Sequence, residues 1–501
     1  MKVLLANPPC KQAINRYYEK YFIRAGSRWP HSGIKRKSQL PHYLPFPFFL
    51  AYSAALLLKE GFEVEVIDGV ALDISIDVFK RMVDEINPDI ILFETTTPTI
   101  DYDLGLVKAI KKKERPVVIL TGTHVTVYSQ SLMEEVKEID YIILGEYEQT
   151  FLQLAKRIRE GSGAAGLKGL SYRENGKVIC TGPSPAIEPL DSLPFPARHL
   201  FPKNDRQNIH VYWDGFCQNR PALQAHASRG CPYRCSFCLW NQVVYNNGRY
   251  RMFSPSRVVD EMEELIKKYK AKEIYFDDDD FTVNKKHVLS VCREIEKRNL
   301  NVKWSCMGDA INLDGELIES MASAGCIGIK FGVESGSPEI LARLGKPVDL
   351  DRVKDVVKRC NDHGIKTHAT FTLGFLEETP ETLKETYLFA KSLNVSSIQV
   401  SICTPFPGTR LFEEAGEKGF LKDAEWSCFD GKAKEIIDLP LLDSARLERY
   451  RVSFLRGWFI SKISNPLWMF FQFRNLLRTL NGLGLKFFIK QVITVFEDDL
   501  Q

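Results

Sequence analysis

The sequence predicts an α/β protein with two successive parallel sheets and a helical C-terminal region. Short apolar runs alternate with amphipathic helical patterns from residue 1 to about 160, which is typical of a doubly wound, Rossmann-like parallel sheet. The same alternation returns over residues 219–420 with six strand candidates, which fits an incomplete TIM-like (β/α)6 barrel. We therefore divide the chain into residues 1–160, a connector over 161–218, residues 219–420, and a helical region over 421–501.

Composition indicates a globular, intracellular protein. The chain has 501 residues, 44% of them hydrophobic, which is enough for two to four domains. Its formal charge of +3 names no partner by itself, and we expect a small-molecule substrate and no nucleic acid. Several of the twelve cysteines, such as Cys292, Cys326 and Cys360, lie inside periodic apolar segments, unlike a secreted disulfide framework. The apolar run before Asn7 has only four residues, 3–6, so the N-terminus reads as a buried strand and not as a signal peptide. We expect a reducing, cytoplasmic environment.

The first sheet is predicted from five strand candidates, at residues 2–6, 63–67, 89–94, 116–121 and 141–144, with helical patterns such as 50–59 between them. Ligands of such sheets bind beyond the carboxyl ends of the strands. The candidate ligand-binding residues at these ends are Asn7, Thr95, Thr96, Gly122, Thr123, His124, Gly145 and Glu146. The one G-x-G-x-x-G match, residues 161–166, follows a helical pattern and reads as a linker.

Two connections in this half of the chain are unusual. Residues 10–45 separate the first strand from the first helix and contain Arg24, Arg28 and Trp29, so they form either a ligand-contacting loop or a solvated basic one. The 161–218 connector contains a hairpin signal at Glu174-Asn-Gly176 and a proline-rich stretch over 189–202, which should remain extended.

The strongest chemical signal is Cys231-Pro-Tyr-Arg-Cys235-Ser-Phe-Cys238, which follows the first strand candidate of the second half. Three soft thiolates in a C-x3-C-x2-C spacing suit an iron–sulfur cluster with one open iron. Structural zinc would need a fourth ligand nearby, and no partner motif follows. The remaining alternatives are three unrelated core cysteines, or a thioredoxin-like pair that leaves Cys231 unexplained.

Four carboxylates, Asp277 to Asp280, follow the second of six strand candidates in this half. Their mutual repulsion could raise one pKa and suit a proton carrier, or the loop could simply face water. The strand candidates are residues 222–227, 273–276, 302–306, 327–333, 366–373 and 397–403, with helical patterns such as 258–269 and 353–363 between them.

The cysteine spacing resembles the signature of radical S-adenosylmethionine (SAM) enzymes. The resemblance implies that Cys231, Cys235 and Cys238 hold a [4Fe–4S] cluster and that SAM is cleaved to methionine and a 5′-deoxyadenosyl radical. It also implies an external electron donor of the flavodoxin or ferredoxin type. The six βα units agree with the barrel of this family.

The resemblance assigns roles to further residues. Phe237 would lie near the adenine of SAM, Asp277 and Asp278 would take its amino group as catalytic candidates, and Glu334 with Ser335 would meet the ribose. Asp279 and Asp280 would lie closer to substrate or solvent. Residues 405–409 are similar to the closing motif beside the adenine, and Trp240, Tyr250 and Arg251 would either face the substrate or pack in the core.

The first half resembles the cobalamin-binding domain that is fused to some radical SAM domains. The likeness lies in Leu4-Leu-Ala-Asn-Pro-Pro9, Val66-Ile-Asp-Gly69, Gly122-Thr-His124 and Leu144-Gly-Glu-Tyr-Glu148. No Asp-x-His-x-x-Gly motif supplies an axial histidine, so the resemblance implies a base-off corrinoid. His124 would line the corrinoid or merely cap its loop. Without the likeness, a flavodoxin-like domain that binds another nucleotide, or nothing, would be the default.

The combination is similar to the cobalamin-type radical SAM proteins of hopanoid and bacteriochlorophyll pathways. It implies a methyltransferase in which one SAM supplies the radical and another supplies a methyl group carried by cobalamin. The alternative within the same machinery is a radical cyclase or ring-rearrangement enzyme on a lipid-like substrate. From a different class, the alternative is a non-catalytic iron–sulfur redox sensor.

The tail is basic and aromatic. Between Tyr450 and Phe496 lie seven basic residues, no acidic one, two tryptophans and seven phenylalanines. Either the phenylalanines pack over the barrel mouth while the basic residues face water, or basic amphipathic helices lie in a membrane interface. We expect peripheral membrane contact through residues 450–496, in helices divided at Pro466 and at Gly482-Leu-Gly484. No apolar run reaches the roughly 20 residues needed to span a bilayer.

Overall fold

The chain folds into two compact units, each assembled from separate stretches of sequence. The computed structural model describes residues 1–37, 43–112, 115–202, 211–212, 214–431, 436–466, 468–470, 472–473, 477 and 480. The first unit comprises Met1–Asn204, Ser236–Arg249 and Thr404–Lys432, and the second comprises Asp205–Cys235, Tyr250–Cys403 and Ala433–Gln501. The boundary between the units therefore falls inside the cysteine motif, after Cys235.

The first unit contains a seven-stranded sheet in the order β10-β9-β8-β7-β6-β1-β5. Its strands are β1 (Lys2–Asn7), β5 (Glu63–Asp68), β6 (Ile90–Thr95), β7 (Val117–Gly122), β8 (Tyr141–Ile143), β9 (Leu170–Glu174) and β10 (Lys177–Cys180). The first five are parallel and confirm the five expected strands, whereas β9 and β10 are antiparallel. The hairpin expected at Glu174-Asn175-Gly176 thus extends the first sheet.

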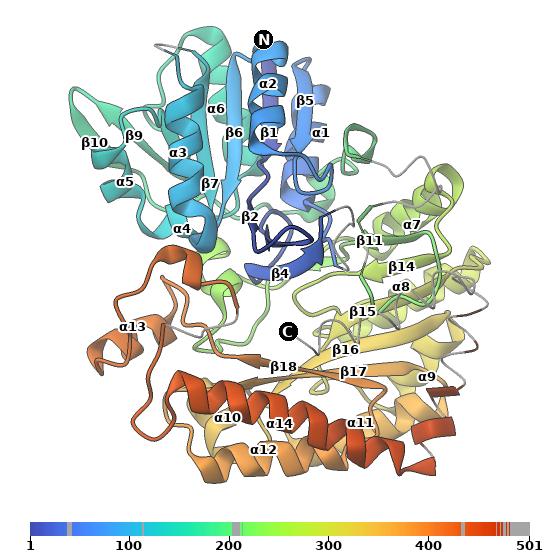
Figure 1. The fold of residues 1–501 in the computed structure, drawn as a ribbon. Helices are drawn as coiled ribbons and strands as arrows, with labels where there is room; N and C mark the ends of the chain where they lie inside the picture. The colour runs from blue at the N-terminus through green and yellow to red at the C-terminus, as the bar shows by residue number, and fades with distance from the viewer. Residues whose placement is uncertain are drawn as a thin grey trace. The chain divides into compact units, whose positions relative to one another are not determined.

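Helices cover both faces of this sheet (Figure 1). Side chains of α2 (Ile76–Ile86), α3 (Ile100–Ile110) and α5 (Ser129–Glu135) share one core cluster with alternate residues of the strands. On the other face α1 (Phe48–Lys59) packs against α6 (Glu148–Glu160). Because both faces are buried, all six residues of β6 are buried, which explains its continuous apolar run.

The described residues of the 10–45 connection, 10–37 and 43–45, include regular structure where the sequence predicted a long loop. They form an antiparallel sheet of β2 (Lys11–Ala13), β3 (Tyr18–Ile23) and β4 (His31–Arg36). Lys35, on β4, forms ion pairs with Glu19 at 2.7 Å and with Asp73 at 3.0 Å. Sequence reasoning missed these strands because charged residues interrupt the apolar alternation and Gly26 and Pro30 read as loop.

The second unit is built on a six-stranded parallel sheet in the order β11-β14-β15-β16-β17-β18, so all six expected strands are present. They are β11 (Ala222–Ala225), β14 (Glu273–Phe276), β15 (Lys303–Gly308), β16 (Cys326–Glu334), β17 (Lys366–Leu373) and β18 (Ser397–Ile402). The connecting helices are α7 (Pro255–Tyr269), α8 (Lys285–Lys297), α9 (Gly315–Ser323), α10 (Pro338–Leu344), α11 (Leu350–Asp362) and α12 (Pro380–Ser392). Consecutive βα units place neighbouring strands side by side, so the carboxyl ends of all six strands lie at one edge.

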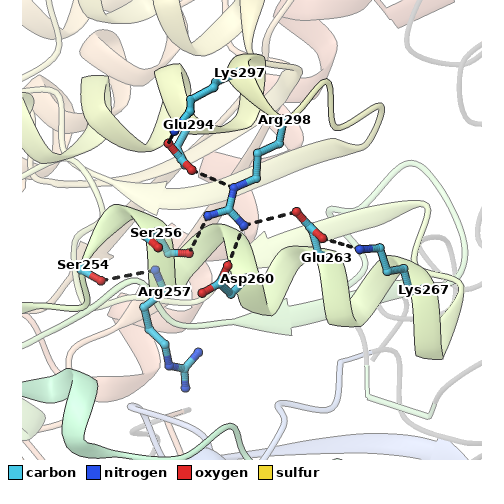
Figure 2. Close-up of polar contacts among 9 residues, drawn as sticks. All are labelled: Ser254, Ser256, Arg257, Asp260, Glu263, Lys267, Glu294, Lys297 and Arg298. Carbon is cyan, nitrogen blue, oxygen red and sulfur yellow. Dashed lines mark hydrogen bonds and ion pairs between the residues drawn. The ribbon is translucent and has the colours of Figure 1, made fainter.

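An arginine after α8 links the first two of these helices (Figure 2). Arg298 donates to Glu294 on α8 at 2.7 Å, and to Asp260 at 2.6 Å and Glu263 at 3.2 Å on α7. Ser254 caps the start of α7 by accepting a hydrogen bond from the Arg257 amide. These contacts hold α7 and α8 side by side.

After β18 come α13 (Arg410–Glu417), which belongs to the first unit, and α14 (Ser444–Ile463), which lies beside α12 in the second unit (Figure 1). The expected break near Pro466 is present, because α14 ends at Ile463 and helical structure resumes at Pro466. The second expected break, at Gly482-Leu-Gly484, lies outside the described residues. None of the described helices is long and apolar enough to cross a membrane.

Candidate functional site

The cysteine motif lies on a loop whose base is closed by two short strands. β12 (Ser228–Arg229) pairs with β13 (Arg251–Met252), so residues 230–250 leave and re-enter the fold at adjacent points. Cys235 is buried, Cys231 and Cys238 are half-buried, and all twelve cysteines are free thiols. Among the described residues, no group of three or more His, Cys, Asp or Glu side chains is placed so that it could hold a metal ion. The assignment of these cysteines as cluster ligands stays a prediction from their spacing.

The chemistry of these thiols nevertheless suits iron. Burial raises the pKa of Cys235 to about 11, and the nearby Lys346 opposes that effect. The thiol is therefore protonated at neutral pH unless a soft, electrophilic metal displaces its proton. The donor set fits an iron–sulfur cluster.

Two of the four consecutive aspartates hold the chain that enters the cysteine loop. The Asp278 carboxylate accepts hydrogen bonds from the Ala227 amide at 2.9 Å and from the Ser228 hydroxyl. Asp279 accepts one from the Gly230 amide at 3.0 Å. Asp277, Asp278 and Asp280 are buried, so the alternative of an acidic loop facing water is wrong for these three. The expected contact of Asp277 and Asp278 with the amino group of SAM stays a prediction.

A second acidic group lies at the carboxyl ends of β14, β15 and β16, around a lysine that sequence analysis missed. Lys346 Nζ lies 3.1 Å from Asp309 and 3.8 Å from Glu334, and its side chain is 11% exposed. Gly345, in the left-handed conformation at φ 68°, ends α10 and turns the chain so that Lys346 returns to the end of β16. Because nothing in the local sequence signals this return, the lysine could not be singled out.

Burial and the charges of neighbouring groups shift the pKa values of Asp280, Glu334 and Lys346. Burial, and then repulsion from Asp309, raises the pKa of Asp280 to about 7, and its Oδ2 atom has no hydrogen-bond partner. Burial also raises the pKa of Glu334, although Lys346 opposes it. Burial lowers the pKa of Lys346, but the Asp309 and Glu334 carboxylates outweigh it and raise that pKa above its usual value. Three carboxyl groups around one lysine form a site suited to a cation, such as the sulfonium of SAM.

Glu334 is held in an unusual conformation where its strand ends. Its φ of 68° is left-handed, and the register between β16 and β17 shifts between Gly332 and Glu334. A Cβ atom on Gly332 would lie 2.2 Å from Glu334 Oε1, so a side chain there would displace the carboxylate from this position. Thr372 donates to Glu334 Oε2 at 3.0 Å. The neighbouring Ser335 is fully buried, and its hydroxyl contacts Thr386 at 3.0 Å, which ties this turn to α12.

In the first unit, a buried polar network surrounds the end of β1. Asn7 donates to Asp68 at 2.9 Å and accepts from Arg24 Nε at 3.1 Å. Arg24 also forms a fully buried ion pair with Asp103 at 2.5 Å, and its second terminal nitrogen has no hydrogen-bond partner. One arginine from the 10–45 connection thus reaches the predicted ligand edge of the sheet.

The ends of β6 and β7 approach each other closely. Gly122 adopts φ 115°, and a Cβ atom there would lie 2.0 Å from the Thr95 carbonyl oxygen. The buried Thr123 Oγ1 and His124 Nδ1 atoms have no hydrogen-bond partner. Burial lowers the pKa of His124 to about 4, so its ring is neutral at physiological pH.

The His124 ring lies among aromatic rings of the same unit. Its centroid is 4.8 Å from that of Tyr128 and 4.9 Å from that of Trp426. Trp426 belongs to the 404–432 stretch, about 300 residues away in sequence, which the sequence analysis did not connect with this edge. The His124 side chain therefore packs against two aromatic rings that also contact each other.

The remaining predicted edge residues contact other residues of the first unit. Thr96 Oγ1 lies 3.3 Å from Thr99 Oγ1, and Glu146 accepts a hydrogen bond from the Ile187 amide at 3.4 Å. A Cβ atom on Gly145 would lie 2.8 Å from the Val244 carbonyl oxygen, so this glycine permits close packing of the segment that follows the cysteines.

Three separately predicted stretches meet in an aromatic group of the first unit. Trp29 stacks on Phe237 with ring centroids 5.9 Å apart and lies 6.3 Å from Phe406. Trp29 remains 39% exposed, so one side of this group is open to a ligand or to solvent. Trp240, by contrast, is buried against Phe49 with centroids 5.6 Å apart, which supports its packing role.

The edge of the first sheet fits a large ligand that carries hydrogen-bonding groups. Arg24, Thr123 and His124 each hold a buried polar atom without a partner, and such atoms are rare unless a ligand or water satisfies them. The amide side chains of a corrinoid could supply these partners.

In comparison with known proteins, two separate parts of the chain each match a family model. Residues 226–390 match the radical SAM superfamily, and residues 43–155 match the B12 binding domain. An uncharacterized methyltransferase of Pyrococcus horikoshii is 33% identical over 428 residues, which cover 85% of each chain. An anaerobic magnesium-protoporphyrin IX monomethyl ester cyclase of Rubrivivax gelatinosus is 30% identical over 432 residues, covering 83% of this chain and 74% of the relative.

Solved structures with the same α/β fold include TsrM, a radical SAM methyltransferase from Kitasatospora setae, with cobalamin and a [4Fe–4S] cluster bound. It is 20% identical, has a TM-score of 0.67, and the match covers 91% of this chain and 88% of TsrM. OxsB, a cobalamin-dependent SAM radical enzyme with aqua-cobalamin and SAM bound, has a TM-score of 0.67 at 16% identity, covering 99% of this chain and 74% of OxsB.

Proposed function

The chain belongs to the cobalamin-dependent radical SAM enzymes, and from that premise we propose that it transfers a methyl group to an unactivated centre of an apolar or lipid-like substrate. The cofactors of the family are a [4Fe–4S] cluster, SAM and cobalamin. The observation that carries methyl transfer is the 33% identity to a methyltransferase over 85% of both chains. An external electron donor of the flavodoxin or ferredoxin type would complete the reaction.

Each cofactor has candidate residues in this chain. Cys231, Cys235 and Cys238 would hold the cluster, and Phe237, Asp277, Glu334 and Ser335 would contact SAM. The strand-end residues Asn7, Thr95, Thr96, Gly122, Thr123, His124, Gly145 and Glu146 would surround cobalamin. When bound, the cluster and SAM supply a 5′-deoxyadenosyl radical and cobalamin carries the methyl group.

The residues of the protein hold and orient these groups. Asp278 and Asp279 fix the backbone that enters the cysteine loop, which limits where the thiols can lie. Lys346 holds Asp309 and Glu334 together, so the negative charge offered to a SAM cation is fixed before binding. The consecutive order of six parallel strands supports an incomplete TIM-like barrel as the frame of this site.

A radical cyclase is the second candidate, and the observation that favours it is the 30% identity to the Rubrivivax gelatinosus cyclase. Other relatives include a cytidylyl-2-hydroxyethylphosphonate methyltransferase of Streptomyces wedmorensis and a bacteriochlorophyllide d methyltransferase of Chlorobaculum tepidum. These substrates differ too widely to choose one for this chain. A non-catalytic sensor does not agree with membership of an enzyme family.

Product analysis tests the proposed function. The enzyme, reconstituted without oxygen and supplied with cobalamin, reductant, methyl-labelled SAM and a host lipid extract, should form 5′-deoxyadenosine, S-adenosylhomocysteine and a labelled lipid product. Formation of 5′-deoxyadenosine with an unlabelled, cyclised product would favour the cyclase. Absence of SAM turnover with a fully loaded cluster would contradict both.

Cobalamin should bind base-off, without a nitrogen ligand from His124. We expect the optical spectrum of bound cobalamin to be nearly unchanged by His124→Ala, because no axial-histidine motif is present. The full chain is required, since Trp426, which packs on His124, lies outside residues 1–160.

Gly122→Ala serves as a comparison, because its Cβ atom would collide with the Thr95 carbonyl and should weaken cobalamin binding. A spectrum of the His124 variant that shows loss of a nitrogen ligand would contradict the base-off assignment.

A further inference from the structure

The inner face of α14 and the residues that follow it is fastened by polar side-chain tips. Trp458 Nε1 donates to the Ala390 carbonyl at 3.1 Å, and Lys462 Nζ donates to the carbonyls of Lys391 at 2.7 Å and Leu393 at 2.6 Å. These carbonyls lie in and just after the last turn of α12, where a helix leaves carbonyl groups unpaired and favours a cation.

The same pattern continues beyond the break at Pro466. Trp468 Nε1 donates to the Val395 carbonyl at 2.8 Å, and Gln472 Nε2 donates to the Ser396 carbonyl at 2.7 Å. Both helical segments therefore direct the polar ends of these side chains inward, onto the end of α12 and the short stretch of chain that joins it to β18. The inward contacts fix which face of each segment points outward.

In the last turns of α14 and just after Pro466 the outward side is apolar, unlike that of a usual surface helix. We define the tail face as Phe459, Ile460, Ile463, Met469, Phe470 and Phe473, whose exposed fractions lie between 46% and 68%. The alternative, that the tail phenylalanines are packed inward, describes Phe454, which is buried against Phe371, and does not describe the exposed Phe459, Phe470 and Phe473.

Charge indicates what the tail face contacts. Between Tyr450 and Phe496 the sequence has seven basic residues and no acidic one. Arg456 is exposed one helical turn before Ile460, and so lies on the same side of α14. A second copy of this chain would bring like charges together, whereas an anionic lipid surface offers both opposite charge and an apolar interior.

We propose that the tail face docks the enzyme onto an anionic phospholipid bilayer, with its aromatic and aliphatic side chains inserted at the interface. The apolar side chains would enter between the lipids, and the basic residues would contact the headgroups. Taken with the proposed function, on which this extension rests, the surface lets the enzyme collect an apolar substrate from the bilayer.

Flotation of the full chain with phosphatidylcholine vesicles, with and without roughly 30% phosphatidylglycerol, tests the docking. The protein should float with the anionic vesicles at low salt and much less at high salt. The double variant Ile460→Ser/Phe470→Ser should lower the vesicle partition coefficient about tenfold or more. The variant Ile14→Ser/Leu441→Ser, which changes side chains that are 51% and 54% exposed elsewhere, should float like the wild type.

Point variants are preferable to removal of the tail, because truncation before α14 would uncover the carbonyls of α12 and the buried contacts of Phe454. Equal flotation of the tail-face and control variants, or no flotation of the wild type, would overturn the proposal. A wild-type dimer that becomes monomeric in the tail-face variant, without vesicle binding, would assign the face to a second copy instead.

The docking and the chemistry can fail separately. Cys235→Ala should float like the wild type although it lacks SAM cleavage, and the tail-face variant should form 5′-deoxyadenosine in solution like the wild type. Loss of flotation in the Cys235 variant would show that vesicle binding depends on the cluster site, and would overturn docking through the tail face.

Discussion

Replacing any one of Cys231, Cys235 and Cys238 by alanine should abolish both iron binding and 5′-deoxyadenosine formation. Each thiolate would be one of three protein ligands of the cluster. The loss of one therefore leaves two of the four irons without a protein ligand. The measurements are iron and sulfide content after anaerobic reconstitution, and 5′-deoxyadenosine by chromatography. The expected effect is complete loss and not a partial decrease.

Cys292, Cys326 and Cys360 are matched controls, because they are buried core thiols of the unit that contains Cys231 and Cys235. Their alanine variants should lose about 1 kcal/mol of stability through the small cavity that each leaves, and should keep full iron content. Full cluster content and activity in a variant of Cys231, Cys235 or Cys238 would contradict the radical SAM assignment of the motif.

Lys346→Met should strongly destabilise the protein and prevent SAM binding. The substitution removes the cation that lies 3.1 Å from Asp309 and 3.8 Å from Glu334, and leaves buried carboxylates that repel each other. Loss of one partner of a buried ion pair costs about 3 kcal/mol or more. The measurements are the free energy of unfolding in denaturant and SAM binding by equilibrium dialysis.

Two variants separate a specific role from general loss of charge. Lys346→Arg keeps the cation and should restore most of the stability and part of the SAM binding. Lys285→Met also removes a lysine with two carboxylate partners, Asp314 and Glu316 at 2.6 Å each, but these partners are more exposed, so its effect should be small. Wild-type stability and SAM affinity in Lys346→Met would contradict the role of Lys346.

The parallel strands of both sheets could be predicted because each is a short apolar run between helical patterns. Strands β14 (Glu273–Phe276) and β17 (Lys366–Leu373) lie at the expected residues. Every residue of β14 is buried, whereas β17 alternates buried and half-buried side chains. Strands β2 to β4 carried no such signal, since their polar and aromatic residues are partly exposed and their pairing depends on contacts such as that of Lys35 with Asp73.

The candidate site was predictable only in part. Gly122 and Thr95 could be named from their strand-end positions, because parallel strands bring these positions to one edge. The close packing against the Thr95 carbonyl oxygen, which would lie 2.0 Å from a Cβ atom at Gly122, could not be predicted, because it depends on how far each strand extends. The same holds for Trp426, which reaches His124 from the far end of the chain.

The sequence by itself determined the two sheets, the cysteine motif and the membership that follows from them, because apolar periodicity and ligand spacing are local along the chain. Only the tertiary structure decided that Lys346 lies among the carboxyl groups at the strand ends, and that the tail presents phenylalanines to solvent while its tryptophans and Lys462 face inward. Both depend on which groups meet after the chain turns back on itself. A pattern of residue types indicates that a helix has two different faces. What each face contacts depends on carbonyl groups and carboxylates that are distant in the sequence.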